Sequence, residues 1–337
     1  MSKGVTDKYS LLPIQDSLQW NRFVERSPDA TLFARAEYLE ATGRKIAYFQ
    51  VIKGGEPRAG VYLVLDETDS EKTDFDDLVI YSGLVLFPPS GNEGNQTILS
   101  KRFEITEFVI SELALKFKKI MMALAPSLND IRPFLWHNYH EADAAKKFSI
   151  RIRYTTLVNI ESIRGNSDEQ ACLAYEEMSS SRRQEIRYAR KDGISASEKG
   201  SVADLIRLYR ATFAKQNAEM AEVDARCRRI EALASNLLEI NLAKLFVVNN
   251  KEGKAVSAAL FGLHGKNAYY LFGGNDPEHI DRYSGTIVIW DAFKALSQVG
   301  ITMVDLEGVN SPARGWFKLS FGGTLNPYYH CILDPGK

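Results

Sequence analysis

Three charged side chains cluster near the end of the chain, after an apolar run at residues 301–306 that is typical of a buried strand. Glu307 follows this run directly, and Arg314 and Lys318 come soon after it. A carboxylate can accept a proton during a reaction, and a cation can stabilise a developing oxyanion. Ligands often bind beyond the carboxyl ends of strands, so we predict a reactive site here.

Aromatic residues surround Lys318 at a spacing that indicates a short helix. Trp316, Phe317 and Phe321 recur at helical intervals, and two glycines follow them. Lys318 would then lie among aromatic rings at the end of the preceding strand. The alternative is a solvated loop with an ordinary surface lysine.

Amide formation needs a neutral amine, and two carboxylates of this stretch are candidates for removing its proton. Asp305 lies within the predicted strand and Glu307 at its end. Asp305 has the alternative role of anchoring a loop or helix, so we favour Glu307 as the base. Lys318, or backbone N–H groups, would stabilise the tetrahedral oxyanion. The sequence has neither a Ser-His-Asp nor a metal-ligand spacing, and no metal is predicted.

Length and composition limit the classes of protein to consider. A chain of 337 residues favours two domains, and 45% hydrophobic with 25% charged residues is ordinary for a globular protein. Nothing in the net charge of -1 predicts strong unspecific nucleic-acid binding. Three separated cysteines fit a reducing cytoplasm. No signal-peptide pattern and no membrane-spanning run is found, so we expect a cytoplasmic protein.

The predicted elements occur in the same order in each half of the chain: helices, a meander of strands, a further helix and a strand. This order predicts an α+β fold made of two similar domains, residues 1–158 and 159–337, with a cleft between them. In the second half, helices are expected at 168–192, 202–216, 226–242 and 285–299, and strands at 245–248, 255–263, 268–273, 301–306 and 327–333. The helix at 285–299 is almost wholly apolar, so we expect it to be buried.

A segment of the first half, DIRPFLWHNY, is rich in aromatic and hydrogen-bonding groups. Arg132, Trp136 and Asn138 of this segment are candidates for binding a sugar or a nucleotide. The alternative is a wedge of core aromatic residues next to a capped helix.

A glycine-containing turn precedes the apolar helix of the second half, in GGNDPEHIDRYSGTIVIW. Backbone N–H groups at a helix start suit a pyrophosphate. The stretch Arg282 to Ile287 partly matches the R/Q-x-x-G-x-G/A loop with which GNAT acyltransferases hold coenzyme A, but Ile287 occupies the final Gly/Ala position. The predicted coenzyme ligands are Arg282, Ser284, Gly285 and Thr286, with Asn275 and Asp276 nearby on the substrate side. The alternative is an ordinary helix start with Ser284 as its cap.

Several segments together resemble the FemAB-like, double-GNAT branch of acyltransferases. They are ATFAKQN, ALFGLHGKNAYYLFGGND, GTIVIWDAF and GWFKLSFGG, with weaker similarity at FARAEYLEATG, YSGLVLFPP and RPFLWHNY. The resemblance implies two tandem GNAT-like domains with mostly antiparallel sheets, and an acceptor, often nucleotide-linked, between them. Members attach amino acids to peptidoglycan precursors from aminoacyl-tRNA, and others are believed to acylate amino sugars.

The resemblance also implies roles for individual residues. Lys318 matches the lysine of the family's F-K-x-x-F-G segment near the transfer centre. Lys215 falls where a basic residue can touch an acceptor diphosphate, and Arg35 lies near the corresponding position of the first domain. Tyr81, in YSGLVLFPP, and Arg314 are further candidates for substrate binding. The inserted coiled-coil arm of some tRNA-dependent members is absent from this sequence.

Three functions remain open at this point. The first is acetyl-CoA-dependent acylation of an amino group on a nucleotide-linked sugar, in the assembly of cell-surface polysaccharide such as lipopolysaccharide. The second is transfer of an amino acid from tRNA to a peptidoglycan precursor, for which Arg183, Arg187 and Arg190 would supply a basic helix face. The third is a binding module without catalysis, in which Ile287 marks a lost coenzyme site. The sequence leaves the oligomeric state undetermined.

Overall fold

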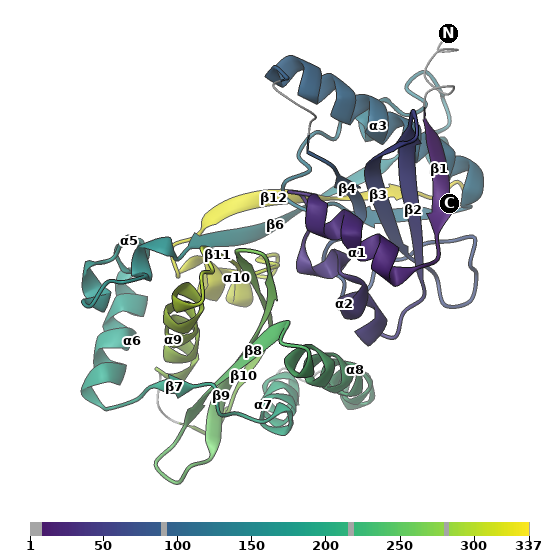
Figure 1. The fold of residues 1–337 in the computed structure, drawn as a ribbon. Helices are drawn as coiled ribbons and strands as arrows, with labels where there is room; N and C mark the ends of the chain where they lie inside the picture. Colours follow the sequence, from purple (N-terminus) through teal and green to yellow (C-terminus); the bar gives the residue numbers. More distant parts are fainter. Residues whose placement is uncertain (1–8, 89–92, 215–218, 280–282, 337) are drawn as a thin grey trace. The chain divides into compact units, whose positions relative to one another are not determined.

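The computed structural model describes residues 9–88, 93–214, 219–279 and 283–336. The chain forms two compact α+β units: residues 1–153 together with 327–337, and residues 154–326. Figure 1 shows that each unit combines a sheet with helices. The sequence-based division at residue 158 kept the C-terminal strand in the second domain, whereas in the structure the last residues belong to the first unit.

The first unit begins with a four-stranded antiparallel sheet in the order β1-β2-β3-β4. These strands are Ser10–Ile14, Ile46–Lys53, Glu56–Val64 and Gly83–Leu86, and helices α1 (Ser17–Arg26) and α2 (Ala36–Ala41) lie between the first two in sequence. Asp16 caps α1 by accepting a hydrogen bond from the N–H of Leu18. Trp20 of α1 is fully buried, and its indole N–H donates to the carbonyl of Ala34 at 2.6 Å.

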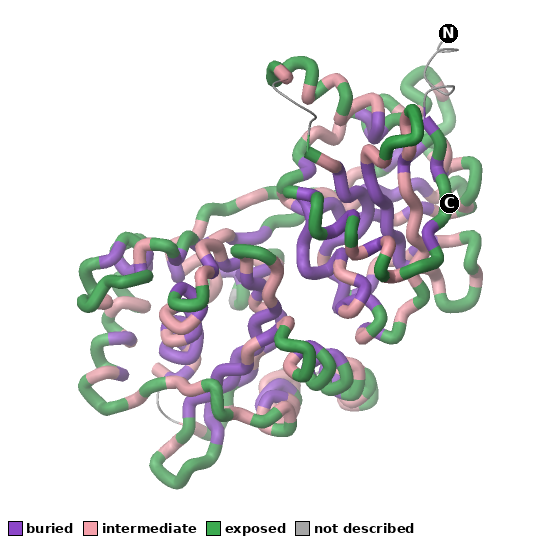
Figure 2. The backbone as a smooth tube through the Cα atoms, in the orientation of Figure 1, coloured by how far each residue is buried: buried purple, intermediate pink, exposed green. Residues whose placement is uncertain are grey.

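The rest of the first unit contains the long helix α3 (Asn95–Lys116), strand β5 (Ile120–Ala123) and the short helix α4 (Arg132–Trp136). Strand β5 pairs with the end of β12 (Thr324–Leu333), with Met122 opposite Cys331. The core of the unit is formed by residues of α3, the sheet and this strand pair. Buried stretches of these elements are coloured purple along the backbone in Figure 2. The C-terminal strand is therefore part of the first unit's core.

The second unit is built on strands in the order β6-β11-β10-β9-β8-β7. They are Ser149–Asn159, Met303–Asp305, Asn267–Asn275, Ala255–His264, Ala243–Asn249 and Ala196–Ser197. Strands β10 and β11 are parallel, because α9 (Ser284–Gln298) carries the chain between them, and the neighbouring pairs are antiparallel. The predicted meander and buried helix of this half are confirmed.

Helices α9 and α7 (Val202–Ala214) pack their apolar residues against this sheet. Helix α9 packs on β8 and β9, and α7 packs on β9 and β10. Helix α8 (Met220–Glu239) packs on α7. In α9, Trp290 and Phe293 are fully buried, as expected for a helix that is apolar on nearly all sides.

One predicted helix is wrong, because residues 168–192 do not form a single helix. They fold into a 3₁₀ turn (Glu169–Ala171), a short helix α5 (Leu173–Glu176) and α6 (Ser180–Lys191). Ser179 interrupts them, since its extended backbone and side-chain oxygen start a new helix by accepting from the N–H of Arg182. Its own N–H donates to the carbonyl of Ser320 at 2.9 Å, which fixes the break by a contact remote in sequence.

Candidate active site

The chain turns sharply where β11 ends, and Asp305 holds this turn. Glu307 has a left-handed backbone with φ of 56°, which is costly for a residue other than glycine. Its N–H donates to Asp305 Oδ1 at 2.7 Å, and the hydroxyl of Thr155 donates to the same oxygen. Asp305 is only 4% exposed. We infer that its carboxylate is engaged in fixing the backbone of Glu307.

The side chain of Glu307 is buried without a hydrogen-bond partner for one of its oxygens. Glu307 is 6% exposed, and among the described residues nothing donates to its Oε1. Burial raises the pKa of this carboxyl well above its ordinary range, and the nearby Asp305 carboxylate raises it further, while Lys318 and Arg226 lower it. A buried carboxyl with a free oxygen and a raised pKa has the properties of a general base.

Lys318 faces this carboxyl from helix α10 (Pro312–Leu319). Pro312 begins the helix at its first turn, where no backbone N–H is needed. The Lys318 Nζ lies 3.5 Å from the carbonyl oxygen of Gly308 and 5.4 Å from the centre of the Tyr270 ring. Burial lowers the pKa of Lys318, which Glu307 partly offsets. The predicted helix around Lys318 is confirmed, and it begins a few residues earlier than expected.

Tyr270 of strand β10 contacts Lys318 through its ring. The register between β10 and β9 shifts between Tyr270 and Phe272. A side chain on Gly273 would meet the Tyr270 hydroxyl at 2.0 Å, so the glycine makes room for it. Burial, and then the charge of Glu307, raise the pKa of Tyr270 to about 12, so its hydroxyl stays protonated at neutral pH.

Arg226 was not singled out from the sequence, yet its charge acts on Glu307. It lies on α8, and its guanidinium is 5.9 Å from the centre of the Tyr209 ring of α7. In the sequence Arg226 is one of several charged residues along an amphipathic helix, and nothing in their spacing distinguishes it. Only the packing of α7 and α8 brings it to the site.

A cleft of about 300 Å³ lies at the N-terminus of α9. It is lined by Arg182, Glu185, Val256, Asn275, Asp276, His279, Ser284, Gly285, Thr286 and Phe317. Five of these were predicted to contact the coenzyme or the substrate, and the cleft brings them together. Because Phe317 precedes Lys318 in α10, this helix reaches both the cleft and the buried carboxyl.

The residues of the cleft fit a coenzyme pyrophosphate. Tyr283, at the N-cap of α9, makes no capping hydrogen bond with its side chain, and backbone N–H groups at a helix start suit a phosphate. Gly285 lets this start approach Asn275, because an added Cβ would lie 3.1 Å from the amide oxygen. The hydroxyl of Thr286 is bonded to Arg182 and Glu185. Arg282 lies outside the described residues.

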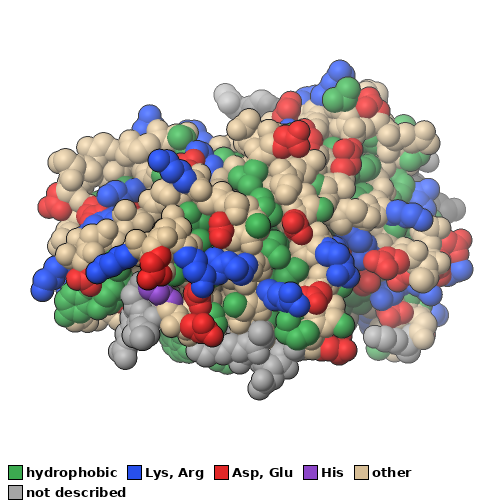
Figure 3. Space-filling model, turned by 90° about the horizontal axis from the view of Figure 1, so that it is seen from below, with side chains coloured by type: hydrophobic (Ala, Val, Ile, Leu, Met, Phe, Trp, Pro, Cys, Tyr) green, Lys and Arg blue, Asp and Glu red, His purple; other side chains and the backbone are tan. Residues whose placement is uncertain are grey.

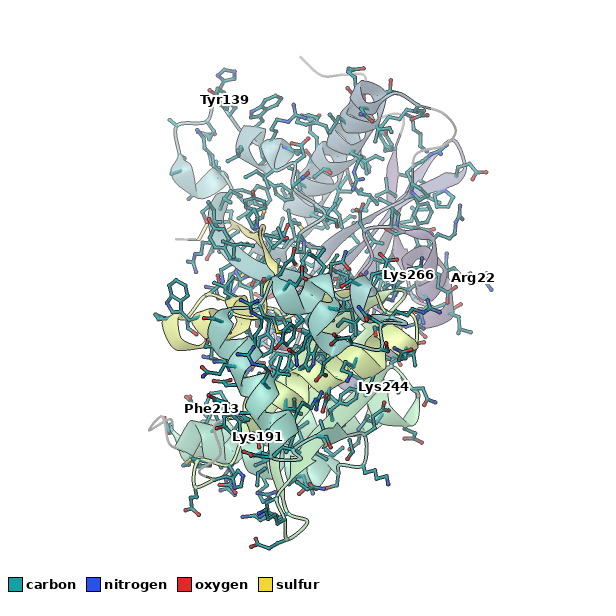
Figure 4. The ribbon with its side chains drawn as sticks, turned by 90° about the vertical axis from the view of Figure 1, so that its left-hand side faces the viewer. Arg22, Tyr139, Lys191, Phe213, Lys244 and Lys266 are labelled. Atoms are coloured by element: carbon teal, nitrogen blue, oxygen red, sulfur yellow. The ribbon has the colours of Figure 1, made fainter. Side chains whose placement is uncertain are left out.

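The other predicted residues fall into two groups. In the second unit, Arg314 is exposed on α10, and its guanidinium lies 6.0 Å from the centre of the Phe213 ring, labelled in Figure 4. Lys215 lies outside the described residues. Among the first-unit candidates, Arg35 pairs with Glu37 at 2.9 Å and Arg132 pairs with Asp130. Tyr81 is fully buried, whereas Trp136 is half exposed. Asn138 donates a hydrogen bond to the carbonyl of Lys146.

Comparison with known proteins identifies the class. Residues 180–315 match the family model of an acetyltransferase (GNAT) domain. No curated protein matches the sequence. A crystal structure of FemX is similar with a TM-score of 0.62 at 15% identity, over 97% of this chain and 98% of that one.

Two other solved structures are similar over almost their whole length. A tandem GNAT protein from the clavulanic acid biosynthesis pathway has a TM-score of 0.53 at 10% identity, covering 98% of this chain and 99% of that one. The structure of L-PGS from Bacillus licheniformis has a TM-score of 0.53 at 10% identity, covering 95% and 92%.

The fold is therefore a FemAB-like tandem GNAT fold, as the sequence resemblance predicted. Residues 180–315, in the second unit, match a GNAT acetyltransferase domain, which supports acyltransferase activity. This domain implies an acyl-CoA co-substrate. Among the described residues, no helix is long and apolar enough to cross a membrane, and no group of three or more His, Cys, Asp or Glu side chains is arranged to hold a metal ion.

Proposed function

We propose that the protein transfers an acyl group, most simply acetyl from acetyl-CoA, to the amino group of a nucleotide-linked amino sugar. The product would serve the assembly of cell-envelope polysaccharide, in the cytoplasm. The observation that supports this proposal is the buried Glu307 carboxyl, which interacts electrostatically with the partly buried Lys318. Lys318 directly follows Phe317, a residue of the cleft at α9. An amine acceptor has a proton to lose, and Glu307 has an oxygen free to take it.

Glu307 would act as the general base in this reaction. Its raised pKa brings a carboxylate closer in basicity to the amine it must deprotonate. The amine nitrogen then forms its bond to the carbonyl carbon of the bound thioester, and the carbon–sulfur bond breaks with the electron pair leaving on sulfur. The proton held by Glu307 is finally released to the thiolate or to water.

Lys318 would stabilise the negative charge that develops on the carbonyl oxygen. A partly buried ammonium acts through a lower local dielectric than that of water, where its effect is greater. The ring of Tyr270 and the carbonyl of Gly308 hold the ammonium in place before the charge develops. When bound, acyl-CoA supplies the reactive thioester, and the N-terminus of α9 would hold its pyrophosphate.

Calorimetry with acetyl-CoA, with and without a panel of UDP- and dTDP-linked amino sugars, tests this function. We expect micromolar binding of acetyl-CoA and release of free thiol when the correct sugar is added. Absence of acetyl-CoA binding, together with thiol release for none of the sugars, would contradict the proposal. Charged tRNA with a cell-wall precursor would then be the next pair to assay.

The tRNA-dependent transfer of an amino acid remains the second candidate, supported by the likeness to FemX. The basic face it needs is only partly available, because Arg190 pairs with Glu169 at 2.8 Å and with Asp291. Acidic and basic side chains are also interspersed on the face drawn in Figure 3. Strongly salt-dependent tRNA binding would favour this candidate. The third hypothesis, a module without catalysis, is set aside because the chain carries an acyltransferase domain.

A further inference from the structure

The first unit contains a pocket of about 310 Å³ that the proposed reaction does not use. It lies between α3, α4 and the ends of β4 and β5. Helix α3 and strand β4 are labelled in Figure 1, and Tyr139, which follows α4 in the sequence, is labelled in Figure 4. Its volume is at the lower end of the range for ligand pockets, which suits a single hydrocarbon chain or a single ring of a ligand.

Most of the pocket wall is hydrocarbon. Its apolar residues are Leu84, Leu86, Ile98, Leu99, Phe103, Leu124, Leu128, Pro133 and Phe134. The residues contributed by α3 recur at helical spacing, so one face of this helix is turned to the pocket. Leu99 is 50% exposed although it faces an apolar cavity, and such exposure of a leucine beside a preformed pocket is what a ligand would cover.

The charged side chains of the pocket wall, Arg102 and Asp130, are each already paired with an opposite charge of the same unit. Arg102 pairs with Asp29, which is 7% exposed. Arg132 pairs with Asp130 at 2.6 Å and lies over the Phe103 ring. A phosphate or free carboxylate would have to displace one of these partners. The charge balance therefore favours an uncharged occupant.

The remaining polar groups of the wall are also partly engaged within the protein. The hydroxyl of Thr106 donates to the carbonyl of Arg102 at 2.8 Å, and the side chain of Ser127 hydrogen-bonds to Asp29. Few groups are left to recognise the several hydroxyls of a sugar, whereas hydrocarbon surface is abundant. The wall is thus suited to contact by burial of apolar surface.

We propose that this pocket binds the hydrocarbon chain of an acyl thioester or of a lipid. The chain would enter past Leu99 and lie against Phe103 and Phe134. The site belongs to the first unit alone and does not depend on the reaction proposed for the second.

Calorimetry with hexyl, octyl and decyl β-glucosides, each below its micelle-forming concentration, tests the proposal. Saturating acetyl-CoA is present, so that the cleft at α9 is not the site observed. We expect affinity to rise roughly 3- to 4-fold for each added methylene until the pocket is filled. Binding that is absent, or that does not depend on chain length, would overturn the proposal.

Two variants at one position localise the site. Leu99→Trp fills the pocket from its half-exposed edge and should weaken octyl glucoside binding at least 10-fold. Leu115→Trp is the matched control, since Leu115 lies on the same helix, is 83% exposed and is not part of the wall. Leu99→Ala should instead shift the best-bound chain to a longer homologue. Equal binding by all three variants and the wild type would place the chain elsewhere and refute the assignment.

A second series distinguishes the two sources of the chain. Octanoyl-CoA and dihexanoyl phosphatidylcholine are titrated separately into wild type and Leu99→Trp. Both ligands carry an acyl chain and should lose affinity in the variant; the source is the ligand that binds the wild type more tightly and loses the larger factor in affinity. If neither ligand is affected by the variant, the pocket does not bind acyl chains.

Discussion

The backbone N–H of Glu307 donates a hydrogen bond of 2.7 Å to the carboxylate of Asp305, two residues earlier. This bond closes the turn at the end of β11 and holds Glu307 in its left-handed conformation. Asp305 therefore both fixes the backbone of Glu307 and places a negative charge beside the proposed base. These two roles are separable, because an asparagine keeps the accepting oxygen and loses the charge.

Asp305→Asn should shift the pH dependence of catalysis to lower pH. The Asp305 charge raises the pKa of Glu307, and without it Glu307 loses its proton at lower pH. Activity requires the carboxylate, so the acidic limb of the kcat/KM profile moves down while the maximum is largely retained. Initial rates from about pH 5 to 9 measure the shift. An unmoved limb would show that Asp305 does not act on the base.

Arg226→Met should shift the same limb in the opposite direction. The Arg226 charge lowers the pKa of Glu307, so its removal leaves the carboxyl protonated up to a higher pH. Arg229→Met, on the same helix, is the control for a general loss of positive charge. A shift of equal size in both variants would point to the overall field of the protein and not to Arg226.

Glu307→Gln should lower kcat about 10²- to 10⁴-fold, the range for removal of a general base. The isosteric amide keeps the volume and cannot accept the proton. The remaining activity should lose its acidic limb. Glu278→Gln, in an exposed turn, is the control and should be neutral. A Glu307→Gln enzyme with wild-type rate and pH profile would eliminate this residue as the base.

Lys318→Met should lower kcat about 10²- to 10³-fold, as expected for loss of one oxyanion donor, with acetyl-CoA affinity retained. Methionine replaces the aliphatic part of the lysine, so the circular dichroism spectrum should be unchanged. Lys294→Met is a control in which an ion pair with Glu169 is lost outside the proposed site. Unchanged turnover in Lys318→Met would refute the role of the ammonium.

Much of the second unit was predictable from local pattern. Strands at 255–263 and 268–273 and the helix at 285–299 agree with β9, β10 and α9 to within a few residues, because their apolar runs are bounded by turn residues. The break at Ser179 was missed, since its hydrogen bond to Ser320 joins segments far apart in sequence. For the same reason the membership of the last strand in the first unit was not visible.

The candidate site shows the same limit. Glu307 and Lys318 are close in sequence and adjoin a strand end, so the sequence pointed to them. Arg226 and Tyr270 lie on α8 and β10, which are distant in sequence from Glu307. An arginine or a tyrosine at these positions does not by itself indicate a functional site. Arg190 was predicted to lie on a basic face, but its pairing with Glu169 depends on the break that the sequence did not reveal.

The buried pair also makes a prediction about stability. The folded-state pKa of Glu307 is raised, so its contribution is fully present below about pH 4.5 and is lost as the pH rises through that raised pKa. The folded-state pKa of Lys318 is lowered, so its contribution is present above about pH 10.5 and is lost as the pH falls through that lowered pKa. Ionisation of the Glu307 carboxyl and protonation of the Lys318 amine therefore each cost stability.

The double variant Glu307→Gln/Lys318→Met should accordingly be more stable than the wild type at neutral pH, although it is inactive. Replacing a buried ion pair by neutral groups of similar volume is often neutral or stabilising by about 1–4 kcal/mol. Urea unfolding at pH 7 measures the gain, and it should shrink toward acidic pH, where Glu307 is protonated. Glu198→Gln/Lys244→Met removes a partly exposed pair joined at 2.6 Å and should change stability little or slightly reduce it. A double variant at the site that is clearly less stable than the wild type would contradict this prediction.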